Sequence, residues 1–221
     1  MFSTESNPLE NIEVRAETCV ESTYEPFLEV KWDEEQDDSI ARLTITPPLE
    51  EDRSRSVTSE LSSGMMENHR FFKLVTPGQE YRVEMTKVGI KNVVSVPNMR
   101  KVVVPPEEPE KISIGLITQS SVQLKLAAPK NGIFDYFFIT ITSAFGKTEH
   151  NTTISDKDSL GGQFYTMVFD NLLPGAHYKI KTFTVSNGVS SLAAKVESCF
   201  TLSPTKPVLG MVLRLLSMIK M

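Results

Sequence analysis

The fold is decided by the stretch Leu172-Leu-Pro-Gly-Ala-His-Tyr-Lys-Ile-Lys-Thr-Phe-Thr-Val-Ser-Asn-Gly-Val-Ser-Ser191. It opens on a Pro-Gly turn, Tyr178 follows three residues after Gly175, and Asn187-Gly188 then gives a hairpin signal. A tyrosine at this spacing is typical of a loop that crosses between the two sheets of a β-sandwich. We therefore predict that the Tyr178 hydroxyl bonds back to upstream backbone and pins such a crossing.

The same pattern occurs earlier in the chain, as Val75-Thr-Pro-Gly-Gln-Glu-Tyr81, 97 positions before Tyr178. Two copies predict two tandem sandwiches, and 221 residues give each about 100, enough to bury a core. The segment Pro105-Pro-Glu-Glu-Pro109 separates them, because three prolines in five residues stiffen an extended linker and cannot lie inside a sheet. We predict an all-β chain with a loose N-terminus (1–8), two seven-stranded antiparallel sandwiches (9–105 and 106–204) and a short C-terminal tail (205–221).

Alternating apolar residues mark the strands. In Phe27–Trp32, the side chains of Leu28, Val30 and Trp32 share one face. Trp32 is the single tryptophan, and we expect it to fill the core of the first module rather than to form a ligand platform, because a buried Trp contributes a large apolar area. Leu126 takes its place in the second module.

Polar segments separate these strands. Residues 33–38 carry five carboxylates, but they lack the glycine-centred spacing of a calcium loop, so a solvated acidic turn is favoured. Residues 47–66 and 146–162 read as long polar loops. The apolar segment 208–221 would make a helix of about 21 Å, against about 30 Å of membrane hydrocarbon. The alternatives for this tail are a short amphipathic surface helix, an interface segment, or a truncated end.

Composition excludes several classes. The net charge is −5, and neither half of the chain offers the basic face that phosphate binding needs, so a nucleic-acid partner is not expected. Cys19 and Cys199 fall in different modules, which favours two buried free thiols over a disulfide framework. The N-terminus lacks the regions of a signal peptide, and no segment has the length of a membrane span.

No residue pattern points to catalysis. His69, His150 and His177 have no metal-ligand spacing, and no nucleophile, phosphate-loop or dinucleotide motif occurs. We therefore expect no enzyme activity, no cofactor, no metal and no small-molecule substrate. Asn151-Thr-Thr153 is the single acceptor for N-linked glycosylation, and there is no Arg-Gly-Asp.

Strand alternation predicts a candidate binding face on the second module. If Tyr178, Ile180 and Thr182 point inward, then Phe183 and Val185 point outward. In the neighbouring strand Phe137, Ile139 and Ile141 would be inward, which leaves Tyr136 and Phe138 outside beside Phe183. Exposed aromatic groups favour a protein partner. The competing interpretation is a register shifted by one residue, or a tail from Val208 that covers the patch. The candidate partner-binding residues are Tyr136, Phe138, Phe183 and Val185.

The Leu-x-Pro-Gly-x-x-Tyr motif at Leu172–Tyr178, its copy ending at Tyr81, and Trp32 together resemble a tandem of fibronectin type III domains, over about residues 9–204. The first copy has Val75 in place of the motif's leucine, and Leu126 departs from the early-strand tryptophan. The resemblance implies two Ig-like sandwiches, with Trp32, Tyr81 and Tyr178 in structural roles.

Within that superfamily, the stretch Phe183-Thr-Val-Ser-Asn-Gly-Val-Ser-Ser-Leu192 resembles the corresponding turn in invertebrate type III receptor-type protein tyrosine phosphatases. That resemblance implies the recognition part of a cell-surface receptor whose ligand is a protein, with the phosphatase domain and membrane anchor missing from this chain. The alternatives are an intracellular or matrix structural fibronectin-repeat protein, and a cytokine-receptor-like binding module. Cytokine receptors usually carry cysteine pairs and a Trp-Ser-x-Trp-Ser box, and this chain has neither.

Overall fold

The computed structural model describes most of both modules. The described residues are 12–19, 25–32, 40–47, 57–62, 69–72, 75–89, 93–144, 148–155 and 164–204. The N-terminal segment 1–8, the acidic segment 33–38 and the tail 205–221 lie outside these ranges, so the interpretations made for them stay predictions.

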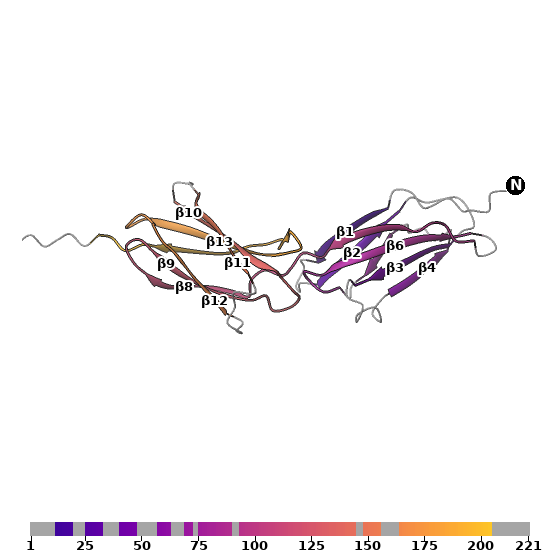
Figure 1. Cartoon of the computed structure of the whole chain (residues 1–221), viewed down its shortest axis with the longest axis horizontal. Coiled ribbons are helices and arrows are strands. Elements are labelled where there is room, and N and C mark those ends of the chain that lie inside the picture. Colours follow the sequence, from indigo (N-terminus) through magenta and orange to yellow (C-terminus); the bar gives the residue numbers. More distant parts are fainter. Residues whose placement is uncertain are drawn as a thin grey trace, which may run out of the picture.

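The first seven strands form two antiparallel sheets. One has the order β1-β2-β5 and the other the order β4-β3-β6-β7. They make up the right-hand half of the molecule, in indigo and magenta (Figure 1). The strands are β1 (Glu13–Cys19), β2 (Glu25–Lys31), β3 (Ile40–Thr46), β4 (Val57–Ser62), β5 (His69–Phe72), β6 (Glu80–Val88) and β7 (Asn98–Val103).

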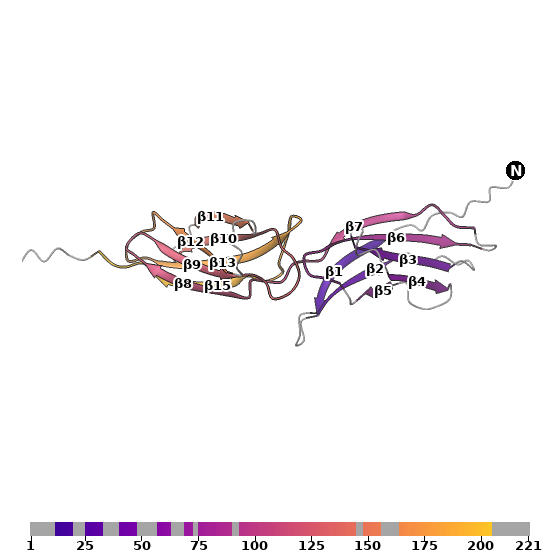
Figure 2. The ribbon, with the colours of Figure 1, turned by 60° about the horizontal axis from the view of Figure 1, so that its bottom comes forward.

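The remaining strands form a second pair of sheets, which lies end to end with the first in both views (Figure 1 and Figure 2). One sheet has the order β12-β9-β8, and in the other β13 pairs with β10 on one side and with β14 and β15 on the other, while β11 pairs with β10. The strands are β8 (Lys111–Ile117), β9 (Val122–Ala127), β10 (Tyr136–Ser143), β11 (Thr148–Ser155), β12 (Phe164–Phe169), β13 (His177–Ser186), β14 (Val189–Ser190) and β15 (Lys195–Phe200).

The all-β prediction is confirmed, because every regular element among the described residues is a strand and all pairs are antiparallel. The strand count differs in the second module. Besides the seven expected strands it has an eighth, the two-residue β14. This strand forms a hairpin with the end of β13 around the Asn187-Gly188 turn. The Asn-Gly signal therefore adds a short strand rather than only closing a long one.

Two segments read as polar loops contain strands. β4 lies within 47–66 and β11 lies within 146–162. Both are edge strands, since each pairs with a neighbour on one side only. An edge strand beside solvent needs few apolar side chains, so the alternation that predicts a central strand is weak there.

Each module has its own core between its two sheets. In the first, Trp32 is buried with Leu28, Val30, Leu43 and Met85. In the second, Tyr178 is fully buried and Phe137 packs against Tyr165, with ring centroids 5.0 Å apart and nearly perpendicular. This edge-to-face geometry is favourable for aromatic pairs, beyond the area that the rings bury. Leu126, at the position equivalent to Trp32, is fully buried as well.

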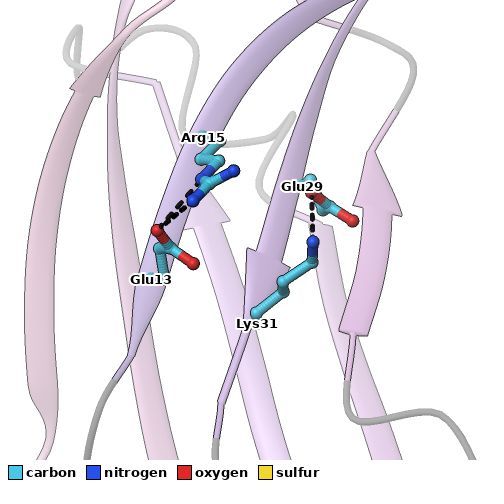
Figure 3. A network of polar contacts seen from close by, with 4 residues as sticks. All are labelled: Glu13, Arg15, Glu29 and Lys31. Carbon is cyan, nitrogen blue, oxygen red and sulfur yellow. Dashed lines mark hydrogen bonds and ion pairs between the residues drawn. The ribbon is translucent and has the colours of Figure 1, made fainter.

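The outer face of β1 and β2 is charged. Glu13 lies opposite Lys31, and Arg15 lies opposite Glu29. Along each strand, Arg15 pairs with Glu13 at 2.6 Å and Lys31 pairs with Glu29 at 3.1 Å (Figure 3). Opposite charges therefore alternate both along and across the strands. The exposed pair of Arg15 and Glu13 contributes about 0.2–1 kcal/mol, whereas Glu29 of the other pair is buried.

Candidate functional site

The tyrosine corners fix the register of β6 and β13. Leu173 N–H donates to Tyr178 Oη at 2.8 Å, and Thr76 N–H donates to Tyr81 Oη at 2.8 Å. In each Pro-Gly turn the glycine N–H also donates to the end of the module: Gly175 to Leu202 O at 3.1 Å, and Gly78 to Val104 O at 2.9 Å. Positive φ angles of 67° and 80° explain why glycine follows the proline in both copies. The two motifs thus share the tyrosine bond. Their other bonds differ in detail, since Gln79 N–H donates to Thr76 O whereas the equivalent Ala176 N–H donates to Thr201 Oγ1.

The corner sets which side chains of the second module face outward. In β13, Tyr178, Ile180 and Thr182 point into the core and are fully buried. Phe183 is half-buried on the opposite face, directly opposite the half-buried Phe138 of β10. The predicted register is confirmed, and the alternative register shifted by one residue is wrong.

Val185 does not belong to this half-buried group. Its side chain is only 4% exposed, although alternation places it on the same face as Phe183. Val185 lies between Tyr136 on β10 and Ser190 on β14, at the end of the strand where the two modules meet. The adjacent module junction, where the neighbouring Ser186 bonds to Gly78 O, accounts for its burial. The aromatic face is therefore formed by three half-buried side chains, Tyr136, Phe138 and Phe183.

The same positions of the first module carry different side chains. Counting from the corner tyrosines, Phe183 corresponds to Thr86 and Phe138 corresponds to Arg42, and these two also lie directly opposite each other. The next pair toward the corner is Thr44 opposite Glu84. These two rows of the first module are thus polar and charged, so an aromatic pair at this place is not required by the fold.

Polar and apolar residues surround the aromatic face. Asn151, Thr140 and Lys181 form the next row across β11, β10 and β13. Asn151 is exposed on the edge strand β11, not in a loop as the sequence indicated. At the start of β13, the ring of His177 lies against the ring of Phe200 at the end of β15, with ring centroids 4.5 Å apart. His177 is therefore half-buried beside an aromatic ring.

The two modules meet in a hydrogen-bonded junction. Ile133 N–H donates to Pro77 O at 2.9 Å, and Ser186 Oγ donates to Gly78 O at 2.7 Å. The linker is held by the second module, because Glu107 accepts from Asn131 N and Nδ2 at 3.0 and 2.9 Å, and its carbonyl accepts from Thr184 Oγ1. The three prolines of the linker are buried: Pro105, Pro106 and Pro109.

The sequence had no signal for this junction. Gly78 and Ile133 are distant in the chain, and neither belongs to a motif that joins them. The close approach of the two modules is a second reason, besides the positive φ, why glycine is required here. A Cβ on Gly78 would lie 1.9 Å from Ile133 O, and a Cβ on Gly132 would lie 2.3 Å from Pro77 O. The Pro77-Gly78 turn thus serves both the corner of its own module and the contact with the next.

Reactive groups do not gather in the described part of the chain. No cluster of three or more His, Cys, Asp or Glu side chains within it has a metal-binding arrangement. Cys199 is a buried free thiol, and desolvation raises its pKa, which disfavours the nucleophilic thiolate. The side chain of Cys19 lies outside the described residues. Among the residues described, no helix is long and apolar enough to cross a membrane.

Comparisons with known proteins agree with this architecture. No protein-family model matches the chain, and no curated protein sequence matches it. A two-domain fibronectin type III segment of chicken tenascin is similar in structure, with a TM-score of 0.56 and 18% identity over 89% of this chain and 100% of that one.

Two further structures match less closely. The FN1-FN3 domains of chicken CNTN1 give a TM-score of 0.39 and 13% identity over 80% of this chain and 63% of that one. A single fibronectin domain of human contactin 1 gives 0.40 and 17% over 47% and 83%. Taken with the paired tyrosine corners, the tenascin segment shows that this chain has the fold of two fibronectin type III domains in tandem.

Proposed function

We propose that this chain is the protein-recognition part of an extracellular or cell-surface receptor, and that it binds a protein partner through the aromatic face of its second module. The observation that carries the proposal is the cross-strand pair of Phe138 and Phe183, both half-buried on the outer face of a sheet, with Tyr136 beside them. Half-exposed aromatic rings bury further area only when another surface covers them.

Two contrasts support this assignment. The equivalent face of the first module presents Arg42 and Thr86, so the aromatic pair is particular to the second module. Exposed Lys179 and Lys181 lie on the same face of β13 and would form a polar rim around the aromatic centre. An apolar centre within a polar rim is the usual arrangement of a protein interface.

The finer assignment is to a receptor tyrosine phosphatase ectodomain. Its support is the resemblance of Phe183–Leu192, which forms the end of β13, the Asn187-Gly188 turn and β14. In that case catalysis belongs to another part of the receptor, since neither Cys19 nor Cys199 stands in a glycine-rich, arginine-bearing phosphate loop.

One observation favours a second candidate, a structural spacer. The buried prolines and the direct hydrogen bonds from Ile133 and Ser186 to the first module would hold the two sandwiches in a fixed relation. A spacer needs this rigidity but does not need half-buried aromatic side chains on an outer face. The two candidates therefore differ in what the aromatic face does.

The test replaces both phenylalanines by glutamate, as Phe138→Glu with Phe183→Glu. Phe164→Glu is the matched control, because Phe164 is 70% exposed on β12 in the other sheet. Fluorescent tetramers of each protein are applied to a panel of intact cells and binding is measured by flow cytometry. Binding lost in the double variant and kept in the control, at unchanged thermal midpoints, supports recognition by this face.

Other outcomes point elsewhere. Binding that survives the double substitution removes the aromatic face from the proposal. If wild-type tetramers bind no cell of the panel while the modules stay rigidly joined in solution scattering, the spacer is favoured. Unfolding of the double variant would place the two rings in the core.

A further inference from the structure

The single N-glycosylation acceptor lies beside the aromatic face. Asn151 is exposed on the outer face of β11, and Thr153, the third residue of the acceptor, is exposed on the same face. In register, Asn151 lies opposite Thr140, and Thr153 lies opposite Phe138. Phe138 is therefore the diagonal cross-strand neighbour of Asn151, and diagonal neighbours in an antiparallel pair are about 7–8 Å apart.

A sugar on Asn151 can reach the phenylalanine ring. The first N-acetylglucosamine adds one sugar ring beyond the Asn151 side chain. The face of that sugar ring that carries C–H groups is apolar. Phe138 presents a half-buried ring on this face, and Phe183 continues the apolar surface on the next strand. Covering these rings removes apolar area from water, which is favourable.

The position of β11 leaves room for a glycan. Among the described strands, β11 is the edge of its sheet, and none of them lies beyond Asn151. The strand Thr148–Ser155 carries a single carboxylate, Glu149, and no lysine or proline to protect its edge from pairing with another chain. A bulky hydrophilic group at its centre would supply that protection.

We infer that Asn151 carries an N-linked glycan whose first sugar packs on Phe138, and that this glycan restricts access to the aromatic face. The second half of the inference rests on the proposed function; the first half does not. The donor is a polyprenyl-pyrophosphate-linked oligosaccharide. The Asn151 amide nitrogen forms a bond to the anomeric carbon, the bond from that carbon to the pyrophosphate oxygen breaks, and the amide proton passes to base.

The attachment is tested on the full chain secreted from eukaryotic cells. Intact mass should exceed the sequence mass of 24.7 kDa by one glycan, in the wild type but not in Asn151→Gln. Thr153→Ser keeps the acceptor and should keep the glycan. An unmodified Asn151 in the secreted protein overturns the inference and leaves the Phe138 and Phe183 test of the proposed function intact.

The packing is tested by nuclear magnetic resonance of the glycosylated protein. Protons of the first sugar should show an upfield ring-current shift in the wild type, and this shift should vanish in Phe138→Leu, which keeps an apolar side chain without the ring. Phe164→Leu is the control and should leave the sugar signals unchanged. Sugar signals that are the same in wild type and Phe138→Leu overturn the packing.

Access to the face is tested by enzymatic removal of the glycan, which leaves aspartate at position 151. Cell binding of tetramers should rise about tenfold, equivalent to about 1.4 kcal/mol, and the non-glycosylated Asn151→Asp variant should match the treated protein. Equal binding before and after removal, when Phe138→Glu with Phe183→Glu still abolishes it, overturns the regulation alone. If no form binds cells while the ring-current shift is present, the proposed function fails and the packing stands.

Discussion

Gly78→Ala is expected to loosen the junction between the modules while both sandwiches stay folded. The added Cβ would meet the carbonyl oxygen of Ile133 at 1.9 Å and its carbon at 2.8 Å. Both are backbone atoms, so no side-chain rotation relieves the clash. The Pro77-Gly78 turn and the loop that contains Ile133 must therefore move apart.

The magnitude has two parts. Gly78 has a φ of 80°, and an L-residue in this left-handed region costs about 1–2 kcal/mol. Separation of the modules would also break the bonds from Ile133 N to Pro77 O (2.9 Å) and from Ser186 Oγ to Gly78 O (2.7 Å). At about 0.5–1.5 kcal/mol net for each bond, about 1–3 kcal/mol is added to the backbone strain.

Two other glycines provide matched controls. Gly175 has a φ of 67° in the equivalent turn, and the nearest atom to its added Cβ is Ser203 Oγ at 3.2 Å. Gly188 has a φ of 78°, and nothing lies within 4 Å of its added Cβ. Alanine at Gly188 measures the cost of the backbone angle alone, and alanine at Gly175 measures the same turn without a neighbouring module.

The assay combines urea unfolding with small-angle X-ray scattering. Gly78→Ala should lose more stability than Gly188→Ala and should broaden the distribution of molecular dimensions, whereas Gly175→Ala should keep the wild-type profile. If Gly78→Ala costs no more than Gly188→Ala and leaves the scattering profile unchanged, the close approach of the two modules does not exist in solution.

Two further predictions concern the cores. Trp32→Ala should cost the first module about 3–5 kcal/mol because Trp32 is buried at the end of β2; an unchanged urea midpoint, followed by circular dichroism, would show that it is outside the core. Tyr178→Phe should cost the second module about 1–1.5 kcal/mol, because it removes the acceptor of the Leu173 N–H at 2.8 Å and leaves the ring in place. Coincident urea melts of Tyr178→Phe and wild type would contradict a stabilising corner bond.

Local patterns in the sequence predicted the fold well because each depends on a few adjacent residues. The Pro-Gly turn and Tyr178 specify the crossing loop, and two-residue alternation specifies which face of β10 and β13 is buried. The polar edge strands β4 and β11 were missed because solvent, not a core, faces much of their surface. The two edge strands are recognised only from their pairing with β3 and β10, and not from their local amino-acid composition.

The candidate site was predictable only in part. Alternation placed Phe138 and Phe183 on one outer face, and the structure has them directly opposite each other. Alternation gives a direction but not what covers a side chain, and this is why Val185 was wrongly counted as exposed. The hydrogen bonds of Ile133 and Ser186 to the first module join residues that are distant in the sequence and belong to no common motif or alternation pattern. The junction therefore had no signal in the sequence.

The two corners show how a neighbour changes the role of one motif. Pro77 and Gly78 are buried where Ile133 and Ser186 bond to their carbonyls, whereas Pro174 and Gly175 are exposed although both corners have the same tyrosine bond. The motif therefore specifies the crossing between sheets, and the adjacent module decides whether the turn is also an interface. Because the tyrosine bond is common to both corners, the difference in stability between alanine at Gly78 and alanine at Gly175 isolates the contribution of the junction.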